Sequence, residues 1–491
     1  MEYIPIASRK PTFKSHAGFS NAISSSGDNQ MSTSPDTSMR SLEEIVRRLN
    51  PNVPAGATAD AMPRIPRDSN AVRQITTLLR ADPFGKALLT GHIGVGKSTE
   101  LMHLTNELAP QRFTIRCSIA DSLGVHNADT FTLLVVVLEA AIRAWISQLL
   151  PMPPGLIEQL VERVDKLLPM EKRPPKPERG SRTTMSPALT AFQEGMRAMH
   201  EALGVGEGLE RIRTGEQLAA LYSDCIRRLA IRYVPDADLA SIDVSAVVES
   251  CEVILKEIGE KFRKPVLLVI DDLDKVMDPA LQQSLFIDRA MAWRRLPCAV
   301  VATLPFDAYF RERSAEIDQL WTEVLVLDPL PIPTPDGQDL SEPALQPYLT
   351  MLHEAGAERL FSARQTRRLA HASGGLPRTF IYFCSTCALY ALEANATHVL
   401  NSHIDLVLQD MANKWRGRLT DSDYEGIEKV LQSEGTNVRN VVQPLRDGIL
   451  IRDGSQQPDK QYRIAPWAEP LLNAYQKRTQ VASTDAAKNW R

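Results

Sequence analysis

The sequence lacks several features that would assign it to a class by composition alone. Its six cysteines, among 491 residues, do not show the paired spacing of a zinc module or a disulfide framework, which fits a reducing cytoplasm. Its 56 Lys and Arg residues stand against 60 Asp and Glu residues, and a formal charge of −4 gives no global attraction to nucleic acid or anionic membranes. The first ten residues have no apolar core of a signal peptide, and the most apolar run, Phe131 to Leu150, contains Glu139 and Arg143. We therefore expect a soluble, cytoplasmic chain without a membrane span.

The most informative stretch reads GHIGVGKST, between an apolar strand pattern at Ala87 to Thr90 and an amphipathic helix. Its glycines allow a tight turn whose backbone N–H groups face a phosphate, and the helix start adds its positive end. Lys97 is suited to reach the outer phosphates of ATP, and Ser98 to be a Mg²⁺ ligand. We assign His92 no role of its own. The predicted nucleotide-binding residues are Gly91, His92, Ile93, Gly94, Val95, Gly96, Lys97, Ser98 and Thr99.

A second signal, KPVLLVIDDLDKV, has a continuous apolar run from Val266 to Ile270 that ends in carboxylates. Such a run is typical of a parallel strand that is buried on both faces, and its carboxyl end is expected beside the phosphate-binding loop. There Asp271 can hold Mg²⁺, directly or through water, and Asp272 can orient or deprotonate the attacking water. Asp274 could support either role.

Two further positions are predicted to approach the nucleotide. The apolar strand pattern from Pro297 ends at Thr303, which is a candidate sensor of the γ-phosphate. In the sequence SGGLPR the glycines end one helix and Pro377 begins the next, so Arg378 lies at a helix start that can fold back over the nucleotide. Upstream of the loop, Ile65 to Asp68 is a candidate base-side loop, although an ordinary helix cap explains it equally well.

With these residues in place, the chain resembles P-loop ATPases of the AAA+ and STAND type, including initiator-like and KAP-like ATPases. GHIGVGKST, VLLVIDDLD, the strand ending at Thr303 and SGGLPR correspond in order and spacing to Walker A, Walker B, sensor 1 and a sensor 2-like motif. The resemblance implies a parallel α/β sheet with the P-loop strand central, a helical lid, and ATP-driven change between lid and core. It also implies an arginine that completes the site of a neighbouring subunit, from the helix before the last strand, where Arg311 and Arg313 are the candidates.

The sequence departs from that pattern in two places. Most AAA+ ATPases have glutamate where this chain has Asp272, so a nucleotide-binding scaffold with little hydrolysis stays open. KAP-type relatives carry membrane spans between the Walker motifs, and this chain has none there. The absence of an Asn-Lys-x-Asp base reader argues against a GTPase.

The chain divides into segments by composition and period. We expect a disordered segment at 1–40, a P-loop ATPase core at 41–335 with a helical insertion at about 123–262, a helical lid at 336–415, a winged-helix-like domain at 416–480 and a tail at 481–491. The Pro-rich linker at 171–182 has five basic and two acidic residues, a local charge of +3. Residues 420–478 have eight basic and nine acidic residues, a net charge of −1, so DNA binding there is not favoured.

These patterns predict an ATP- and Mg²⁺-dependent P-loop ATPase that acts as a nucleotide-controlled switch, and the resemblance implies that it forms a homo-oligomer on ATP binding. A protein partner could bind the helical insertion. The main alternative is a DNA-associated loader or remodeller that acts through the winged helix or the basic linker.

Overall fold

The computed structural model describes the chain from the first helix to the last, with gaps. The described residues are 42–53, 65, 67, 70–119, 129–147, 244–432, 438–452 and 462–489. The segment expected to be disordered, most of the helical insertion and the basic linker at 171–182 lie outside these residues.

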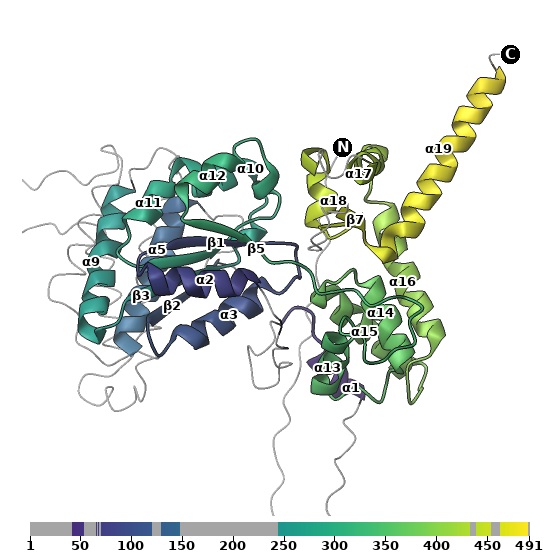
Figure 1. The fold of residues 1–491 in the computed structure, drawn as a ribbon, viewed down its shortest axis with the longest axis horizontal. Coiled ribbons are helices and arrows are strands. Elements are labelled where there is room, and N and C mark those ends of the chain that lie inside the picture. Colours follow the sequence, from purple (N-terminus) through teal and green to yellow (C-terminus); the bar gives the residue numbers. More distant parts are fainter. Residues whose placement is uncertain are drawn as a thin grey trace, which may run out of the picture. The chain divides into compact units, whose positions relative to one another are not determined.

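A five-stranded parallel sheet carries the P-loop (Figure 1). Its strands lie in the order β2-β3-β4-β1-β5. Each forms where the sequence has a short run that is rich in β-branched and apolar residues, and the strands predicted before the P-loop, at Val266 to Ile270 and up to Thr303 are all present. The bounds are β1 (Lys86–Thr90), β2 (Phe113–Ser118), β3 (Val266–Asp271), β4 (Ala299–Thr303) and β5 (Glu323–Val326).

The two faces of the sheet belong to two separate apolar cores, because successive residues of a strand point to opposite faces. On β3, Leu267 and Val269 lie in a core shared with α2 (Asn70–Ala81) and α3 (Lys97–Leu108). Leu268 and Ile270 lie in the other core, which is built with α5 and α9. The predicted burial of this strand on both faces is therefore confirmed.

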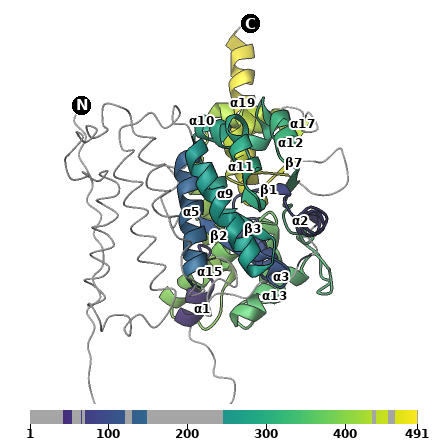
Figure 2. The same ribbon diagram turned by 90° about the vertical axis from the view of Figure 1, so that its left-hand side faces the viewer.

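Helices of the insertion cover the second core. The most apolar run of the sequence forms most of α5 (Thr130–Ser147), which packs against α9 (Ser245–Phe262), and Figure 2 shows the two side by side. No helix in the described part of the chain is long and apolar enough to cross a membrane. Around the strands lie η4 (Leu273–Lys275), α10 (Pro279–Gln283), η5 (Ser284–Asp288), α11 (Ala290–Arg295), η6 (Ala308–Phe310) and α12 (Ser314–Leu320).

Four helices follow the sheet in the region predicted to form a lid, and α1 (Leu42–Arg48) contacts them through α15. Pro377 is the first residue of α15, as the sequence predicts, and Gly374 and Gly375 have positive φ in the turn before it. The lid helices are α13 (Gln346–Ala355), α14 (Ala363–Ala372), α15 (Pro377–Glu393) and α16 (Asn401–Arg416).

The C-terminal unit, in the region expected to be winged-helix-like, has the order helix, helix, two antiparallel strands and helix. Strand β6 pairs with β7 from Leu450–Ile464 to Arg452–Tyr462. Its apolar residues join the same core as the lid helices and one face of the sheet. The elements are α17 (Asp421–Gln432), η7 (Val438–Val441), α18 (Val442–Arg446), β6 (Leu450–Arg452), β7 (Tyr462–Ile464), η9 (Pro466–Ala468) and α19 (Glu469–Asn489).

One expectation about the sheet is wrong. The P-loop strand β1 is an interior strand, but the middle position belongs to β4, which pairs with β1 on one side and with β3 on the other. The strand that ends at Thr303 thus separates the P-loop strand from the acid-ended strand. This placement brings Thr303 between the two chemical signals of the sequence.

Candidate nucleotide-binding site

The loop between β1 and α3 has the backbone shape that a phosphate requires. Gly91, Gly94 and Gly96 have φ values of 143°, 82° and 107°, in the region that favours glycine. A Cβ at Gly91 would lie 2.6 Å from the carbonyl oxygen of Leu327, and a Cβ at Gly94 would lie 2.7 Å from Cβ of Arg378. The loop is therefore closely packed against the chain after β5 and against the start of α15.

Lys97 is the buried cation of this loop. Its Nζ donates to the carbonyl oxygens of Gly91, at 2.8 Å, and His92, at 3.0 Å. The same Nζ forms an ion pair with Oδ2 of Asp274 at 2.9 Å, and the lysine side chain is 4% exposed. Phosphate oxygens are acceptors of the same kind as these partners, so a bound triphosphate can replace them.

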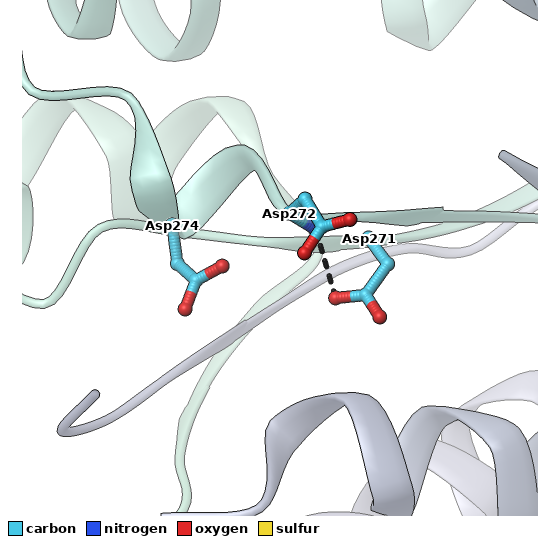
Figure 3. A group of neighbouring side chains, drawn as sticks. All are labelled: Asp271, Asp272 and Asp274. Carbon is cyan, nitrogen blue, oxygen red and sulfur yellow. Dashed lines mark hydrogen bonds between the residues drawn. The ribbon is translucent and has the colours of Figure 1, made fainter. Parts of the chain in front are cut away.

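Three carboxylates meet where β3 ends, and Figure 3 shows Asp271 and Asp274 pointing to the same side of the ribbon. The ligand atoms of Asp271, Asp272 and Asp274 lie within 4.8 Å of one another. Burial raises the pKa of Asp271, and the neighbouring charges of Asp272 and Asp274 raise it further. Ser98 forms a side-chain hydrogen bond with Asp271, which favours the ionised form. Hydroxyl and carboxylate oxygens are ligands that Mg²⁺ prefers, so Ser98 and Asp271 fit the predicted metal site.

Asp272 differs from its neighbours in its backbone and in its partners. Its φ of 71° lies in the left-handed region, which is uncommon for a residue other than glycine. Its Oδ2 accepts a hydrogen bond from Oγ of Ser118 at 2.7 Å, and its Oδ1 pairs with Nζ of Lys275 at 2.5 Å. Both carboxylate oxygens therefore have partners in this structure, and the role of Asp272 toward the attacking water stays a prediction.

Thr303 lies fully buried at the carboxyl end of β4. Its Oγ1 accepts a hydrogen bond from the backbone N–H of Asp274 at 3.3 Å. The candidate sensor therefore contacts the loop that carries the acids, and its role toward a γ-phosphate stays a prediction.

A cavity of about 260 Å³ extends from the P-loop toward α1 and the lid. It is lined by polar residues, among them Lys97, Ser98 and Asp274, and by apolar side chains that include Ile65 and Met351. A lining that has both polar and apolar groups suits the phosphates and the base of a nucleotide. Of the candidate base-side loop, residues 65 and 67 are described, and both line the cavity.

Arg67 is a site residue that the sequence analysis did not single out. Its Nη1 donates to the carbonyl oxygen of Val95 at 3.0 Å, and its Nε lies 3.6 Å from Oε1 of Glu100. The arginine therefore holds the P-loop and the first turn of α3 from the base side. No local pattern marks this contact, because it joins residues 28 positions apart.

The predicted arginines lie in different surroundings. Arg378 lines the cavity, and its backbone N–H donates to the carbonyl oxygen of Gly94 at 3.2 Å. Arg311 and Arg313 precede α12 and are not within it, which corrects the expectation of a helical position. Arg311 pairs with the buried Asp307 at 2.6 Å, whereas Arg313 pairs with the exposed Asp288 at 2.9 Å.

His92 has a defined set of partners, although the sequence analysis gave it no role. Its Nε2 accepts a hydrogen bond from the backbone N–H of Arg452 at 2.8 Å, so the proton lies on Nδ1, which donates to the carbonyl oxygen of Leu445 at 3.1 Å. Its ring packs edge-on against Phe306, and burial lowers its pKa to about 3. The P-loop is thus bonded directly to α18 and β6 of the C-terminal unit.

The strand order, the glycine loop and the acid-ended strand define the class of the protein. It has the fold of a P-loop NTPase, with a parallel α/β sheet, a helical insertion, lid helices and a C-terminal helix–hairpin–helix unit. The fold class predicted from the sequence is confirmed.

Comparison with known proteins gives distant likenesses among solved structures. No protein-family model matches the sequence, and no curated protein matches it. The chain is similar to Cdc6p from Pyrobaculum aerophilum, with 12% identity over 86% of this chain and 88% of that one, and a TM-score of 0.37. It is similar to the Aeropyrum pernix ORC1 protein in complex with DNA, with 12% identity over 85% and 94% and a TM-score of 0.37. It is also similar to the Thermotoga maritima RuvB Holliday junction branch migration motor, with 11% identity over 82% and 94% and a TM-score of 0.31.

Proposed function

We propose that this protein is a Mg²⁺-dependent ATPase of the AAA+/STAND type, in which the bound nucleotide controls the contacts between the P-loop core, the lid and the C-terminal unit. The observation that carries the proposal is the environment of Lys97. This buried cation has partners that phosphate can replace, and it lies in a cavity at the carboxyl ends of β1 and β3.

The contacts around the P-loop support the switch part of the proposal. The loop bonds to the lid through Gly94 and Arg378, and to the C-terminal unit through His92. A nucleotide that reshapes the loop therefore acts on both regions at once. Mg²⁺, held by Ser98 and Asp271, would neutralise charge on the outer phosphates.

Nucleotide binding and phosphate release, measured together, test this function. Purified protein is titrated with fluorescent ATP, ADP and GTP analogues, and phosphate release is followed with Mg²⁺ and with excess EDTA. We expect ATP binding, and release of phosphate only in the presence of Mg²⁺. Failure to bind any nucleotide would reject the proposal, and binding without phosphate release would favour a nucleotide-binding scaffold.

The second candidate function is a DNA-associated loader or remodeller. The observation that favours this candidate is the order of helices and antiparallel strands in the C-terminal unit, which is the order of a winged helix. The net charge of −1 over residues 420–478 argues against a broad DNA-binding surface there. A gel shift with duplex DNA over a range of salt concentrations decides between the two, because phosphate contacts give a steep salt dependence.

Assembly on ATP binding is also part of the proposal. A γ-phosphate in a P-loop site needs an arginine, either from the same chain or from a neighbour. Arg378 is at hand in the same chain, and the half-exposed Arg313 is the candidate from a neighbour. Native mass measured with and without ATP tests whether nucleotide drives a homo-oligomer.

A further inference from the structure

The three carboxylates after β3 do not have equal access to the cavity. Asp274 lines the cavity, whereas neither Asp271 nor Asp272 is among its lining residues. The side chain of Asp274 is 13% exposed, and its Oδ2 lies 2.9 Å from Nζ of Lys97. Among the acids of the Walker B segment, Asp274 is thus the one that faces the space where the outer phosphates would bind.

Asp272 does not line the cavity, and three features of its surroundings distinguish it from Asp274. Ser118 on β2 donates to one carboxylate oxygen, and Lys275 pairs with the other. The left-handed backbone at Asp272 turns the chain there, so that Asp271 and Asp274 come to the same side. A carboxylate with both oxygens engaged is poorly placed to accept a proton from water.

The position of Asp274 is fixed from behind by the neighbouring strand. Its backbone N–H donates to Oγ1 of the buried Thr303, and its residue lies within the short helix η4. The side chain therefore projects from a rigid support at the ends of β3 and β4. Rigid support of this kind is what a catalytic group requires.

We propose that Asp274, and not Asp272, is the catalytic carboxylate of this ATPase, and that it pairs with Lys97 only while the site holds no triphosphate. This inference rests on the proposed function. When the triphosphate binds, Lys97 turns to the phosphate oxygens and Asp274 loses its cationic partner. The carboxylate then faces the γ-phosphate with an oxygen that can accept a hydrogen bond from water.

The reaction step is a hydrolysis. The oxygen of water forms a bond to the γ-phosphorus, while the bond between that phosphorus and the oxygen bridging to the β-phosphate breaks. The electron pair of the broken bond stays on ADP. Asp274 takes one proton from the attacking water and passes it to solvent, so the products are ADP, inorganic phosphate and one proton.

The ion pair between Asp274 and Lys97 also has a consequence for ATP affinity. In the wild-type protein, ATP must displace the carboxylate of Asp274 from Lys97 and must also bind near its negative charge. An Asp274→Asn protein keeps the shape of the side chain and removes both costs. We therefore expect it to bind ATP more tightly by roughly threefold or more, while it loses turnover.

Matched variants test the assignment. Asp274→Asn and Asp272→Asn are compared with Asp318→Asn, which changes an exposed acid on α12, away from the site. The readouts are phosphate release, ATP affinity in excess EDTA, and the Mg²⁺ concentration that gives half-maximal turnover. Thermal unfolding of each variant checks that the fold is intact.

We expect Asp274→Asn to lower turnover by about 100-fold or more, the usual contribution of general-base catalysis, without weaker ATP binding. Asp272→Asn should lose less turnover than Asp274→Asn, and Asp318→Asn should match the wild type. The assignment is overturned if Asp274→Asn keeps turnover within a few-fold of wild type, if it binds ATP more weakly, or if it needs about ten times more Mg²⁺, which would make Asp274 a metal ligand. Failure of the wild type to bind nucleotide would instead reject the proposed function itself.

Discussion

A buried lysine serves each end of β1: Lys86 is the first residue of the strand, and Lys97, the first residue of α3, reaches back to the loop that follows the strand, and the two lysines have different kinds of partners. At the amino end, Nζ of Lys86 donates to the carbonyl oxygens of Phe84, Leu296 and Cys298. At the carboxyl end, Lys97 donates to two loop carbonyls and pairs with the carboxylate of Asp274 beside a cavity. Burial lowers the pKa of Lys86, and no carboxylate forms an ion pair with it in the described part of the chain.

The two sets of partners indicate different roles. Lys86 stabilises the fold, whereas Lys97 is available to a ligand. The partners of Lys86 are three backbone carbonyl groups that lie just before β1 and β4, at the end of the sheet opposite the P-loop. The partners of Lys97 are groups that an anion at the carboxyl end of the sheet can displace, in agreement with the general position of ligand sites in parallel sheets. The same residue type thus stabilises one end of a strand and serves binding at the other.

The largest expected effect comes from replacing Lys97. A Lys97→Ala protein loses the only buried cation that lines the described cavity near Ser98, so we expect ATP turnover to fall by about 100-fold or more. Nucleotide titration and phosphate release measure this effect. Lys256→Ala, on the exposed face of α9, is the control and should behave as the wild type. Unchanged turnover in Lys97→Ala would contradict the assignment of the site.

Replacing Lys86, the first residue of β1, is expected to change ATP binding little but to lower the stability of the fold clearly. Lys86→Met keeps the length of the side chain and leaves three carbonyl acceptors without their donor. We expect the free energy of unfolding to fall by about 2 kcal/mol, since unsatisfied buried acceptors are costly. Chemical denaturation measures the loss. ATP affinity should stay within about twofold of wild type, and a large loss of affinity with unchanged stability would break the comparison of the two lysines.

The pH dependence of stability tests the environment of His92. Its pKa is lowered to about 3 in the folded protein, from an ordinary value of 6.5, so its contribution to stability is full above pH 6.5 and is lost as the pH falls toward 3. Between pH 7 and pH 5 this one group should cost about 2 kcal/mol of unfolding free energy. Chemical denaturation of wild type and His92→Gln at both pH values isolates the effect. Equal pH dependence in the two proteins would show that the ring is not buried in its neutral form.

The smallest effect on the isolated subunit is expected from Arg313. Its partners Asp288 and Glu316 are exposed, so Arg313→Ala should leave the unfolding midpoint unchanged. If the arginine completes a neighbour's site, turnover per subunit should rise with protein concentration, and mixing Arg313→Ala with Lys97→Ala should recover activity. Turnover that does not depend on concentration, with no recovery on mixing, would leave Arg378 as the charge partner within the same chain.

Local sequence patterns predicted the helices and strands well, because short apolar runs and glycine turns depend on residues that are close together in the sequence. The P-loop strand, the acid-ended strand, the strand that ends at Thr303, the P-loop helix and the start of α15 at Pro377 all lie where the sequence indicates. The position of β4 in the middle of the sheet was not predicted, since strand order depends on contacts between distant segments.

The same limit explains what the sequence did not show of the site. The distinction between Asp272 and Asp274 depends on Ser118, which is 154 residues away, and on a left-handed turn that no adjacent glycine marks. The partners of His92 lie 353 and 360 residues further along the chain. A histidine in a variable position of a loop carries no signal of such contacts.

The bonds of His92 have a consequence for how the protein can change during evolution. Both partners are main-chain atoms, the carbonyl oxygen of Leu445 and the N–H of Arg452, so the two hydrogen bonds themselves require no particular side chain, apart from excluding proline at 452. The C-terminal unit can therefore acquire new surface residues, and new partners, without losing its attachment to the P-loop. By thermodynamic reciprocity, a partner that favours the attached position of this unit alters nucleotide affinity by the same factor by which nucleotide alters the affinity for that partner. One ring in the loop would let different inputs act on the same nucleotide equilibrium.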